Sequence, residues 1–281
     1  MRENFKLKSG RDQLYIFNIS DLHLGSSGCN LKYIDHMKSE IDRLKGPVII
    51  NILGDLFECA SLRVGDSAFS QIWSVNEQLR YAYKLFAPLK RKSNIEIRNA
   101  VPGNHEARLR KDNFDLMESF CDQLKIPYMA DTDAELKYIR DEKPWLNKAR
   151  FNDKIYINDK PLKIFGRHGN GLAKRLDLAM AKQGRDTLNV DADIYVEGHN
   201  HRCHFWPQTI LTSRDEGAVK WRYNGFTGHF LSYPGGYADK AGFDVLPEAF
   251  LRLTVAEIDG KIRVMGQEYF IDRVRPDLWK V

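Results

Sequence analysis

The chain has 281 residues, of which 43% are hydrophobic, so it is long enough to bury a full core as one large domain or two small ones. Its formal net charge of +5 is mildly basic, which favours anionic partners without identifying one. No run of about eighteen apolar residues is present, and the polar residues 1–6 lack the apolar core of a signal peptide, which argues against membrane insertion and secretion. We therefore expect a cytoplasmic globular protein.

The first hundred residues alternate between short apolar runs and amphipathic segments. Three strand-like runs have the length of strands, residues 14–19, 48–53 and 95–101, and the first two are mostly apolar. Apolar residues recur at helical spacing over 31–44 and again over 69–89, where Pro88 is expected to close the helix. Three successive strand-loop-helix units predict an α/β architecture with ligands at the carboxyl ends of the strands.

Residues 107–150 break this rhythm, with a helical pattern over 114–124 and a highly charged stretch after it. We interpret this segment as an insertion that shapes one wall of the site, with plain scaffold as the alternative. No repeat or linker interrupts the sequence, so residues 1–281 are expected to form a single domain that carries this insertion.

The second half of the chain is dominated by strand-like segments. Short strands are expected at residues 154–157, 162–165 and 194–196. Residues 250–255 and 261–265 flank the turn Asp259-Gly260 and predict a hairpin. A second sheet packed on the first would accommodate these segments.

Five short clusters of Asp, Asn and His follow the strand-like runs. They are Asp21-Leu22-His23, Gly54-Asp55-Leu56-Phe57-Glu58, Gly103-Asn104-His105-Glu106, Arg167-His168-Gly169 and Gly198-His199-Asn200-His201. Carboxylate and amide oxygens and imidazole nitrogens are ligands of borderline divalent metals. Taken singly each cluster is weak, because an Asp at a strand end is often a helix cap. Together they predict a two-metal hydrolytic site.

His105 lies beside Asn104 and need not bind metal. A histidine next to a metal cluster is well placed to protonate the leaving oxygen as a general acid, or to stabilise the transition state as a cation. A structural histidine is the alternative.

The ordered set of clusters resembles the calcineurin-like metallophosphoesterase superfamily, whose motifs run D-x-H, G-D-x-x, G-N-H-D/E, H-x and G-H-x-H. The resemblance covers residues from about 15 to 240 and includes every cluster. It implies a four-layer α/β/β/α sandwich, in which two mixed β-sheets are flanked by helices and a dinuclear site lies on loops at one edge.

The resemblance also implies a ligand set. One metal would be held by Asp21, His23, Asp55 and His201. The other would be held by Asp55, Asn104, His168 and His199, so that Asp55 bridges the two. A water or hydroxide between the ions would attack phosphorus in line. Manganese is the expected metal, with iron, zinc and nickel as alternatives.

Three further residues are candidates for catalysis. By the resemblance, His105 would assist the leaving group. Glu58 corresponds to an Asp that orients this histidine in phosphoprotein phosphatases, and could do the same here. Arg108 would reach a non-bridging phosphate oxygen, with an exposed surface role as the alternative.

The resemblance implies a phosphoesterase acting on phosphate esters. It does not identify the substrate, and we expect phosphodiesters of nucleotides or nucleic acid. A DNA exo- or endonuclease of the SbcD type is the main alternative, although Glu106 stands where those nucleases usually have Asp. A phosphomonoesterase or protein phosphatase is disfavoured, because residues 54–58 depart from G-D-x-V-D-R-G. A non-catalytic scaffold is disfavoured because every expected ligand is present. The compact size and residues 198–202 look more like small phosphoesterases of phages and bacteria, and no protein partner is indicated.

Overall fold

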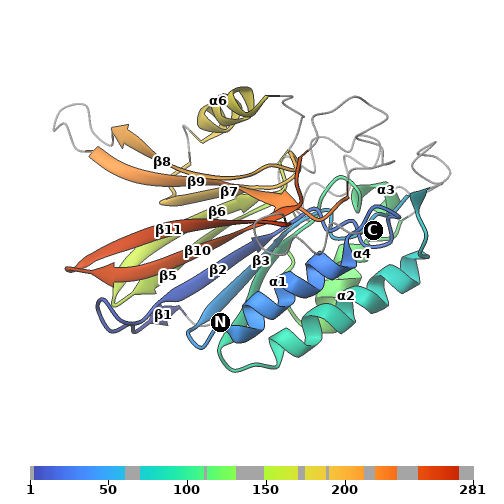
Figure 1. Cartoon of the computed structure of the whole chain (residues 1–281), viewed down its shortest axis with the longest axis horizontal. Coiled ribbons are helices and arrows are strands. Elements are labelled where there is room, and N and C mark those ends of the chain that lie inside the picture. The colour runs from blue at the N-terminus through green and yellow to red at the C-terminus, as the bar shows by residue number, and fades with distance from the viewer. Residues whose placement is uncertain are drawn as a thin grey trace.

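The computed structural model describes residues 3–60, 70–110, 113–130, 149–169, 175–187, 190–211, 219–232 and 246–271. These residues form a mixed α/β fold in which a curled sheet carries helices on its outer faces (Figure 1). The predicted α/β class is therefore confirmed, while the count of four layers stays a prediction. None of the helices in the described ranges is long and apolar enough to cross a membrane.

One half of the sheet is built on the three strand-like runs near the N-terminus. It contains the parallel strands β2 (Leu14–Ile19), β3 (Val48–Leu53) and β4 (Ile95–Val101), followed at one side by the antiparallel strands β10 (Ala249–Ile258) and β11 (Lys261–Phe270). Side chains alternate between the faces of each strand. Along β2, Phe17 and Ile19 join the core under the helices, whereas Leu14 and Ile16 join the core between the two halves of the sheet. Burial of both faces explains why β2 and β3 are largely apolar.

The other half of the sheet is built from later segments of the chain. It contains β1 (Asn4–Phe5), β5 (Arg150–Ile157), β6 (Lys160–Arg167), β7 (Ile194–Glu197), β8 (Cys203–Leu211) and β9 (Val219–His229). The halves are joined where β9 pairs with β10, at His229–Ala249 and Gly228–Phe250. The strand order is β1-β5-β6-β7-β9-β10-β2-β3-β4, with β8 paired to β9 and β11 to β10.

Helices cover the outer faces of both halves. Helices α1 (Leu31–Arg43), α2 (Val75–Lys90) and α4 (Leu116–Leu124) lie against the β2-β3-β4 half, and α6 (Leu176–Asp186) lies on the opposite side of the molecule (Figure 1). The short α3 (Ala107–Arg110) follows β4. Asn30 caps α1 by accepting the N–H of Tyr33, and Ser74 and Glu77 form a capping box at the start of α2.

Helix α2 does not end at Pro88 as predicted. It continues to Lys90, and the N–H of Arg91 still bonds to the carbonyl of Ala87. Pro88 removes only one backbone donor, and a position in the last turn leaves little helix for that loss to disrupt. The hairpin prediction is confirmed, because Asp259 and Gly260 both have positive φ, as a type I′ turn requires.

Part of the predicted insertion belongs to the main core. Helix α4 buries Leu116, Phe120 and Leu124 in the hydrophobic cluster under the helices, so this piece of the segment is scaffold. Residues 111–112 and 131–148 of the insertion lie outside the described residues. The single-domain prediction for residues 1–281 stays a prediction.

Candidate metal centre

The predicted ligands lie on loops at the carboxyl ends of β2, β3, β4, β6 and β7. Five of the seven have left-handed backbone conformations, with φ between 48° and 67°, namely Asp21, His23, Asp55, His199 and His201. Such conformations are uncommon for residues other than glycine and concentrate at functional sites. The loop after β2 runs beside the loop after β3, because the N–H of Asp21 bonds to the Gly54 carbonyl and that of His23 to the Asp55 carbonyl, both at 3.0 Å.

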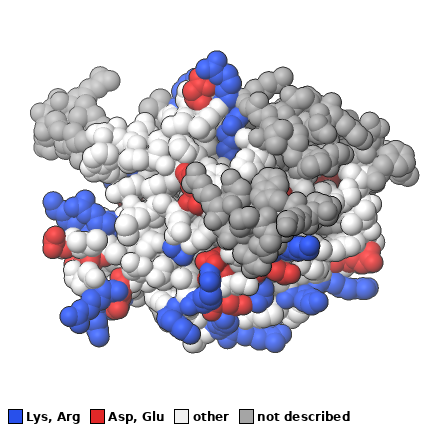
Figure 2. Space-filling model, viewed as in Figure 1, with Lys and Arg blue, Asp and Glu red and all other residues white. Residues whose placement is uncertain are grey.

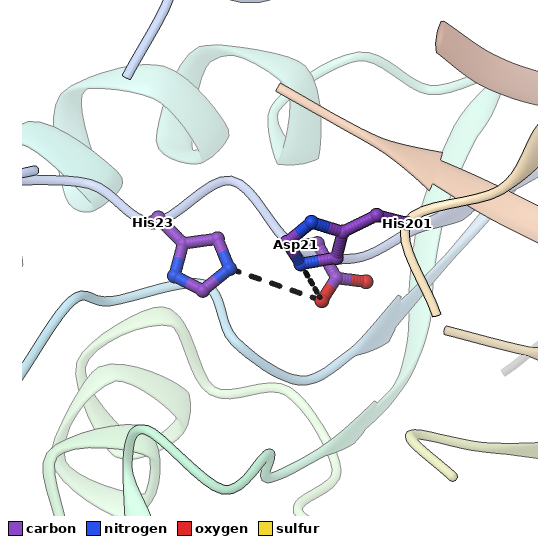
Figure 3. Close-up of side chains that lie close together, drawn as sticks. All are labelled: Asp21, His23 and His201. Carbon is purple, nitrogen blue, oxygen red and sulfur yellow. Dashed lines mark ion pairs between the residues drawn. The ribbon is translucent and has the colours of Figure 1, made fainter. Parts of the chain in front are cut away.

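Asp21 is buried, and only one of its two carboxylate oxygens accepts hydrogen bonds from the described residues. Its Oδ2 accepts the backbone N–H of His199 at 2.9 Å and the hydroxyl of Ser20. Its Oδ1 lies 3.4 Å from Nε2 of His201 and 3.9 Å from Nε2 of His23 (Figure 3). Burial acts to raise the pKa of Asp21, but the contact with His201 and the nearby imidazoles outweigh it and lower the pKa. The carboxylate therefore stays ionised with Oδ1 directed at two imidazoles.

Asp55 lies at the middle of the site. Its Oδ1 accepts the backbone N–H of His105 at 2.8 Å. Its Oδ2 lies 3.2 Å from Nε2 of His168 and 3.9 Å from Nε2 of both His23 and His105. The charges of these imidazoles lower the pKa of Asp55 although burial opposes the change. One oxygen atom thus faces histidines from three separate loops.

The second side of the centre gathers around His168, which is buried at the end of β6. Its Nδ1 donates to the Leu53 carbonyl at 2.7 Å, so its Nε2 faces Oδ1 of Asn104 at 3.0 Å as well as Asp55. The His199 ring lies edge-on to it, with centroids 5.0 Å apart. Burial alone would lower the pKa of His168, but Asp55 raises it to about 10. This position between oxygens therefore attracts positive charge.

The residues fit divalent metal ions. Three groups within the described ranges bring potential ligand atoms close together, namely Asp21, His23 and His201, then His23, Asp55 and His105, then Asp55, His168 and His199. Oδ1 of Asp21 and Nε2 of His23 are buried and make no hydrogen bond within the described part of the chain. Buried polar atoms without partners are costly, and a cation between them would satisfy both.

His105 and Arg108 lie beside the centre and contact one another. Nδ1 of His105 donates to the main-chain carbonyl of Glu58 at 2.9 Å, and Nη2 of Arg108 donates to Nε2 of His105, also at 2.9 Å. Burial lowers the pKa of His105 to about 4. The side chain of Arg108 is 17% exposed, so Arg108 belongs to the wall of the site rather than to an open surface.

The carboxylate of Glu58 is nearer to His23 than to His105. Its Oε2 lies 3.1 Å from Nδ1 of His23 and 3.5 Å from Nδ1 of His105. Burial alone would lower the pKa of His23, but the hydrogen bond and charge of Glu58 outweigh it and raise the pKa. The sequence motif predicted that Glu58 orients His105, whereas in the structure the carboxylate hydrogen-bonds to His23.

Two further residues of the site were not assigned a role from the sequence. Glu106 is fully buried and accepts the backbone N–H groups of Asp55, Phe57 and Gly103, which ties the loops after β3 and β4 together. The sequence shows Glu106 in the Gly-Asn-His-Glu motif, but its hydrogen-bond partners depend on loop conformation and could not be predicted. His229, at the end of β9, stacks on His201 with centroids 4.9 Å apart, and no motif marked it.

The sequence model of one family matches most of the chain. It is described as "Calcineurin-like phosphoesterase" and matches residues 14–203. No curated protein matches this chain.

Several solved structures resemble the chain at low identity. Vacuolar Protein Sorting 29 from Cryptosporidium parvum is 17% identical, covers 92% of this chain and 100% of its own, and gives a TM-score of 0.38. Vps29 complexed with zinc from Entamoeba histolytica is 14% identical, covers 90% and 98%, and gives 0.36. A cold-active protein-tyrosine phosphatase of a Shewanella species is 14% identical, covers 95% and 82%, and gives 0.35.

Proposed function

The chain belongs to the calcineurin-like phosphoesterase family, and we propose that it is a two-metal enzyme that hydrolyses phosphodiesters of nucleotides or nucleic acid. The observation that carries this proposal is the position of Asp55, whose single oxygen Oδ2 faces His23 on one side and His168 on the other. A carboxylate in that position is suited to bridge two cations.

The proposed ligand sets follow the two sides of Asp55. Asp21, His23, Asp55 and His201 would hold the first ion, and Asp55, Asn104, His168 and His199 would hold the second. Manganese is the metal proposed, with iron, zinc and nickel as alternatives, because the ligand set combines oxygen atoms, which suit manganese, with imidazoles, which suit the other three. Two bound cations would polarise the phosphate ester and lower the pKa of a water molecule for attack on phosphorus.

The protein's own residues keep the ligand atoms free for this task. The backbone N–H of His199 and the Ser20 hydroxyl occupy Oδ2 of Asp21, which leaves Oδ1 for the site. The Leu53 carbonyl occupies Nδ1 of His168, which directs Nε2 toward the oxygens of Asn104 and Asp55 in the site. Fixed neighbours of this kind orient ligands and reduce the reorganisation that binding requires.

His105 is proposed to act on the leaving group. The Glu58 carbonyl holds the proton on Nδ1, so Nε2 is the atom that can meet the leaving oxygen. Arg108 now donates to that nitrogen, and its guanidinium is proposed to shift to a non-bridging phosphate oxygen when substrate binds. Nε2 carries a lone pair in this arrangement, so once Arg108 has moved it would first take up a proton from solvent and then pass that proton to the leaving oxygen as the ester bond breaks.

Net charge supports an anionic substrate, and the described residues on the face drawn in Figure 2 form no continuous strip of Lys and Arg. The net charge is +5, and Figure 2 shows Lys and Arg mixed with Asp and Glu over the viewed face. A DNA nuclease of the SbcD type therefore remains the alternative rather than the leading proposal. Cytoplasmic location, a phage or bacterial source, and a pocket wall formed by residues 107–150 stay predictions from the sequence.

The proposal is tested by hydrolysis of two chromogenic esters. Metal is removed, manganese is restored, and rates on bis-p-nitrophenyl phosphate and p-nitrophenyl phosphate are compared for the wild type, Asp55→Asn and His105→Ala. Asp42→Asn is the control, because Asp42 pairs with Lys38 and Lys92 on the helical face. We expect manganese-dependent diester cleavage in the wild type and the control, and a loss of at least about 100-fold in the two site variants. Cleavage of the monoester alone would contradict the diester assignment. If neither ester is cleaved in a metal-dependent way, the proposal that the protein is a phosphoesterase is contradicted.

A further inference from the structure

We propose that Glu58 positions two histidines by separate groups: its carboxylate orients His23 as a metal ligand, and its main-chain carbonyl orients His105. This inference rests on the proposed two-metal site and deepens it. It differs from the role that the motif suggests, in which the carboxylate would serve the catalytic histidine.

The contact with His23 is short and buried. Oε2 of Glu58 lies 3.1 Å from Nδ1 of His23, and the side chains are only 6% and 3% exposed. A carboxylate accepts but does not donate, so it holds the imidazole proton on Nδ1. The lone pair is then on Nε2, which lies 3.9 Å from Oδ1 of Asp21 and 3.9 Å from Oδ2 of Asp55 and has no hydrogen-bond partner among the described residues. A carboxylate behind an imidazole is the arrangement that fixes the tautomer of metal-binding histidines.

The contact with His105 uses a different part of the same residue. The carbonyl oxygen of Glu58 accepts Nδ1–H of His105 at 2.9 Å and Nη1–H of Arg108 at 3.0 Å. The carboxylate is more distant from both, at 3.5 Å from Nδ1 of His105 and 3.6 Å from Nη1 of Arg108. Distances of this length are beyond those of a good hydrogen bond.

The main chain at Glu58 is held independently of the carboxylate. Its N–H bonds to the Leu24 carbonyl at 3.0 Å and to Oε1 of Gln78 at 3.1 Å. Truncating the side chain therefore removes the partner of His23 and leaves the carbonyl in place for His105. The two roles can be separated by experiment.

The test is a cobalt titration that needs no catalysis. Metal-free wild type, Glu58→Gln and Glu58→Ala are titrated with Co²⁺, and binding is followed by visible absorption and calorimetry. Glu40→Ala is the matched control, because Glu40 on α1 is a largely buried glutamate that faces His36 at 3.9 Å outside the site. Circular dichroism of the metal-free proteins checks that each variant is folded.

We expect Glu58→Ala to weaken binding of one of two Co²⁺ ions by about 10–100-fold and to alter the absorption of that ion. Glu58→Gln should fall between this variant and the wild type, because its amide oxygen can still accept from Nδ1 of His23. Glu40→Ala should bind as the wild type does. Wild-type affinity for both ions in Glu58→Ala would overturn the inference, whereas failure of the wild type itself to bind Co²⁺ would instead overturn the two-metal site.

A second measurement separates the two imidazoles. Rates on aryl phosphodiesters with good and poor leaving groups are compared at saturating metal. His105→Ala should widen the ratio between these rates, because poor leaving groups need a proton most. Glu58→Ala should leave the ratio as in the wild type, and an equal widening would show that the carboxylate acts through His105 and would overturn the inference.

Discussion

Replacing Glu106 by alanine removes the acceptor that joins the two central loops of the metal centre. The carboxylate is fully buried and accepts the N–H of Gly103 at 2.8 Å and the N–H groups of Asp55 and Phe57 at 3.0 Å. Alanine carries no acceptor, so three backbone donors lose their partner at once. The loops that carry Asp55 and Asn104 would then lose two of the bonds between them, while the bond from the His105 N–H to Oδ1 of Asp55 would remain.

The size of the effect follows from these three bonds. An unsatisfied buried donor costs about 1–3 kcal/mol, and water that enters the space left by the carboxylate can serve some of the donors. We expect the free energy of unfolding to fall by about 3 kcal/mol, which lowers the melting temperature by roughly 6 °C in a chain of this size. Glu106→Gln keeps one acceptor oxygen, so its loss should be smaller.

Urea denaturation and thermal melting in the presence of a chelator measure this change without a contribution from bound metal. Glu248→Ala is the control, because Glu248 is also buried but accepts from the side chains of Asn30 and Ser232 rather than from the backbone. A loss for Glu106→Ala within about 0.5 kcal/mol of zero, as for an ordinary surface substitution, would refute the role given to this carboxylate.

Three other outcomes are expected. Chelation should lower the melting temperature of the wild type, because metal at 100 times its dissociation constant stabilises the folded protein by about 2.7 kcal/mol. Asp55→Asn, which lacks the shared ligand, should not respond to the chelator. Equal shifts in melting temperature for the two proteins would count against the ligand role of Asp55. Gly54→Ala should abolish metal binding, because Gly54 has φ +80° and the new Cβ would lie 2.6 Å from the Gly103 nitrogen. Gly10→Ala is the control, because Gly10 has a similar φ of +70° and open space around the new Cβ. Normal metal binding by Gly54→Ala would contradict this prediction. Arg98→Met should lower the free energy of unfolding, measured in urea, by about 2 kcal/mol, because Asp153 of β5 loses its bidentate partner on β4. An unchanged urea midpoint would show that this ion pair does not hold the two halves of the sheet together.

Much of the fold could be predicted because burial leaves a simple trace in the sequence. Strands β2, β3 and β4 coincide with the three strand-like runs, and β2 and β3 have few polar residues because both of their faces are buried. Asn18 and Asn51 interrupt two of the runs, and they bond to each other at 3.0 Å in the core. Strands β10 and β11 were found from their turn but run beyond the predicted residues, because pairing continues through polar positions such as Glu257–Ile262.

The pairing of distant strands could not be predicted. Strand β1 has only two residues, Asn4 and Phe5, and it is defined by its partners Tyr156 and Ile157 in β5. Nothing in a two-residue segment distinguishes a strand from a loop, since its hydrogen bonds depend on a segment 152 residues further along the chain. The join between β9 and β10 is equally non-local.

The candidate ligands could be predicted because their order along the chain is characteristic. The residues that hydrogen-bond to these ligands and orient them could not be predicted. The carboxylate of Glu58 lies nearer to His23 than to His105 because of how the loops after β2 and β3 fold, and His23 and Asp55 in these loops have positive φ. The three donors of Glu106 come from two loops, and the stacking of His229 on His201 joins β9 to the loop after β7. Such contacts follow from loop conformation, which residue type and spacing do not determine.

The measurement that tests the two-metal centre most directly is anomalous diffraction from crystals soaked in manganese. We expect two peaks, one beside Asp21, His23 and His201 and one beside Asn104, His168 and His199, with the Asp55 carboxylate between them. A single peak, or peaks that do not share Asp55, would contradict the proposed centre and the function that rests on it.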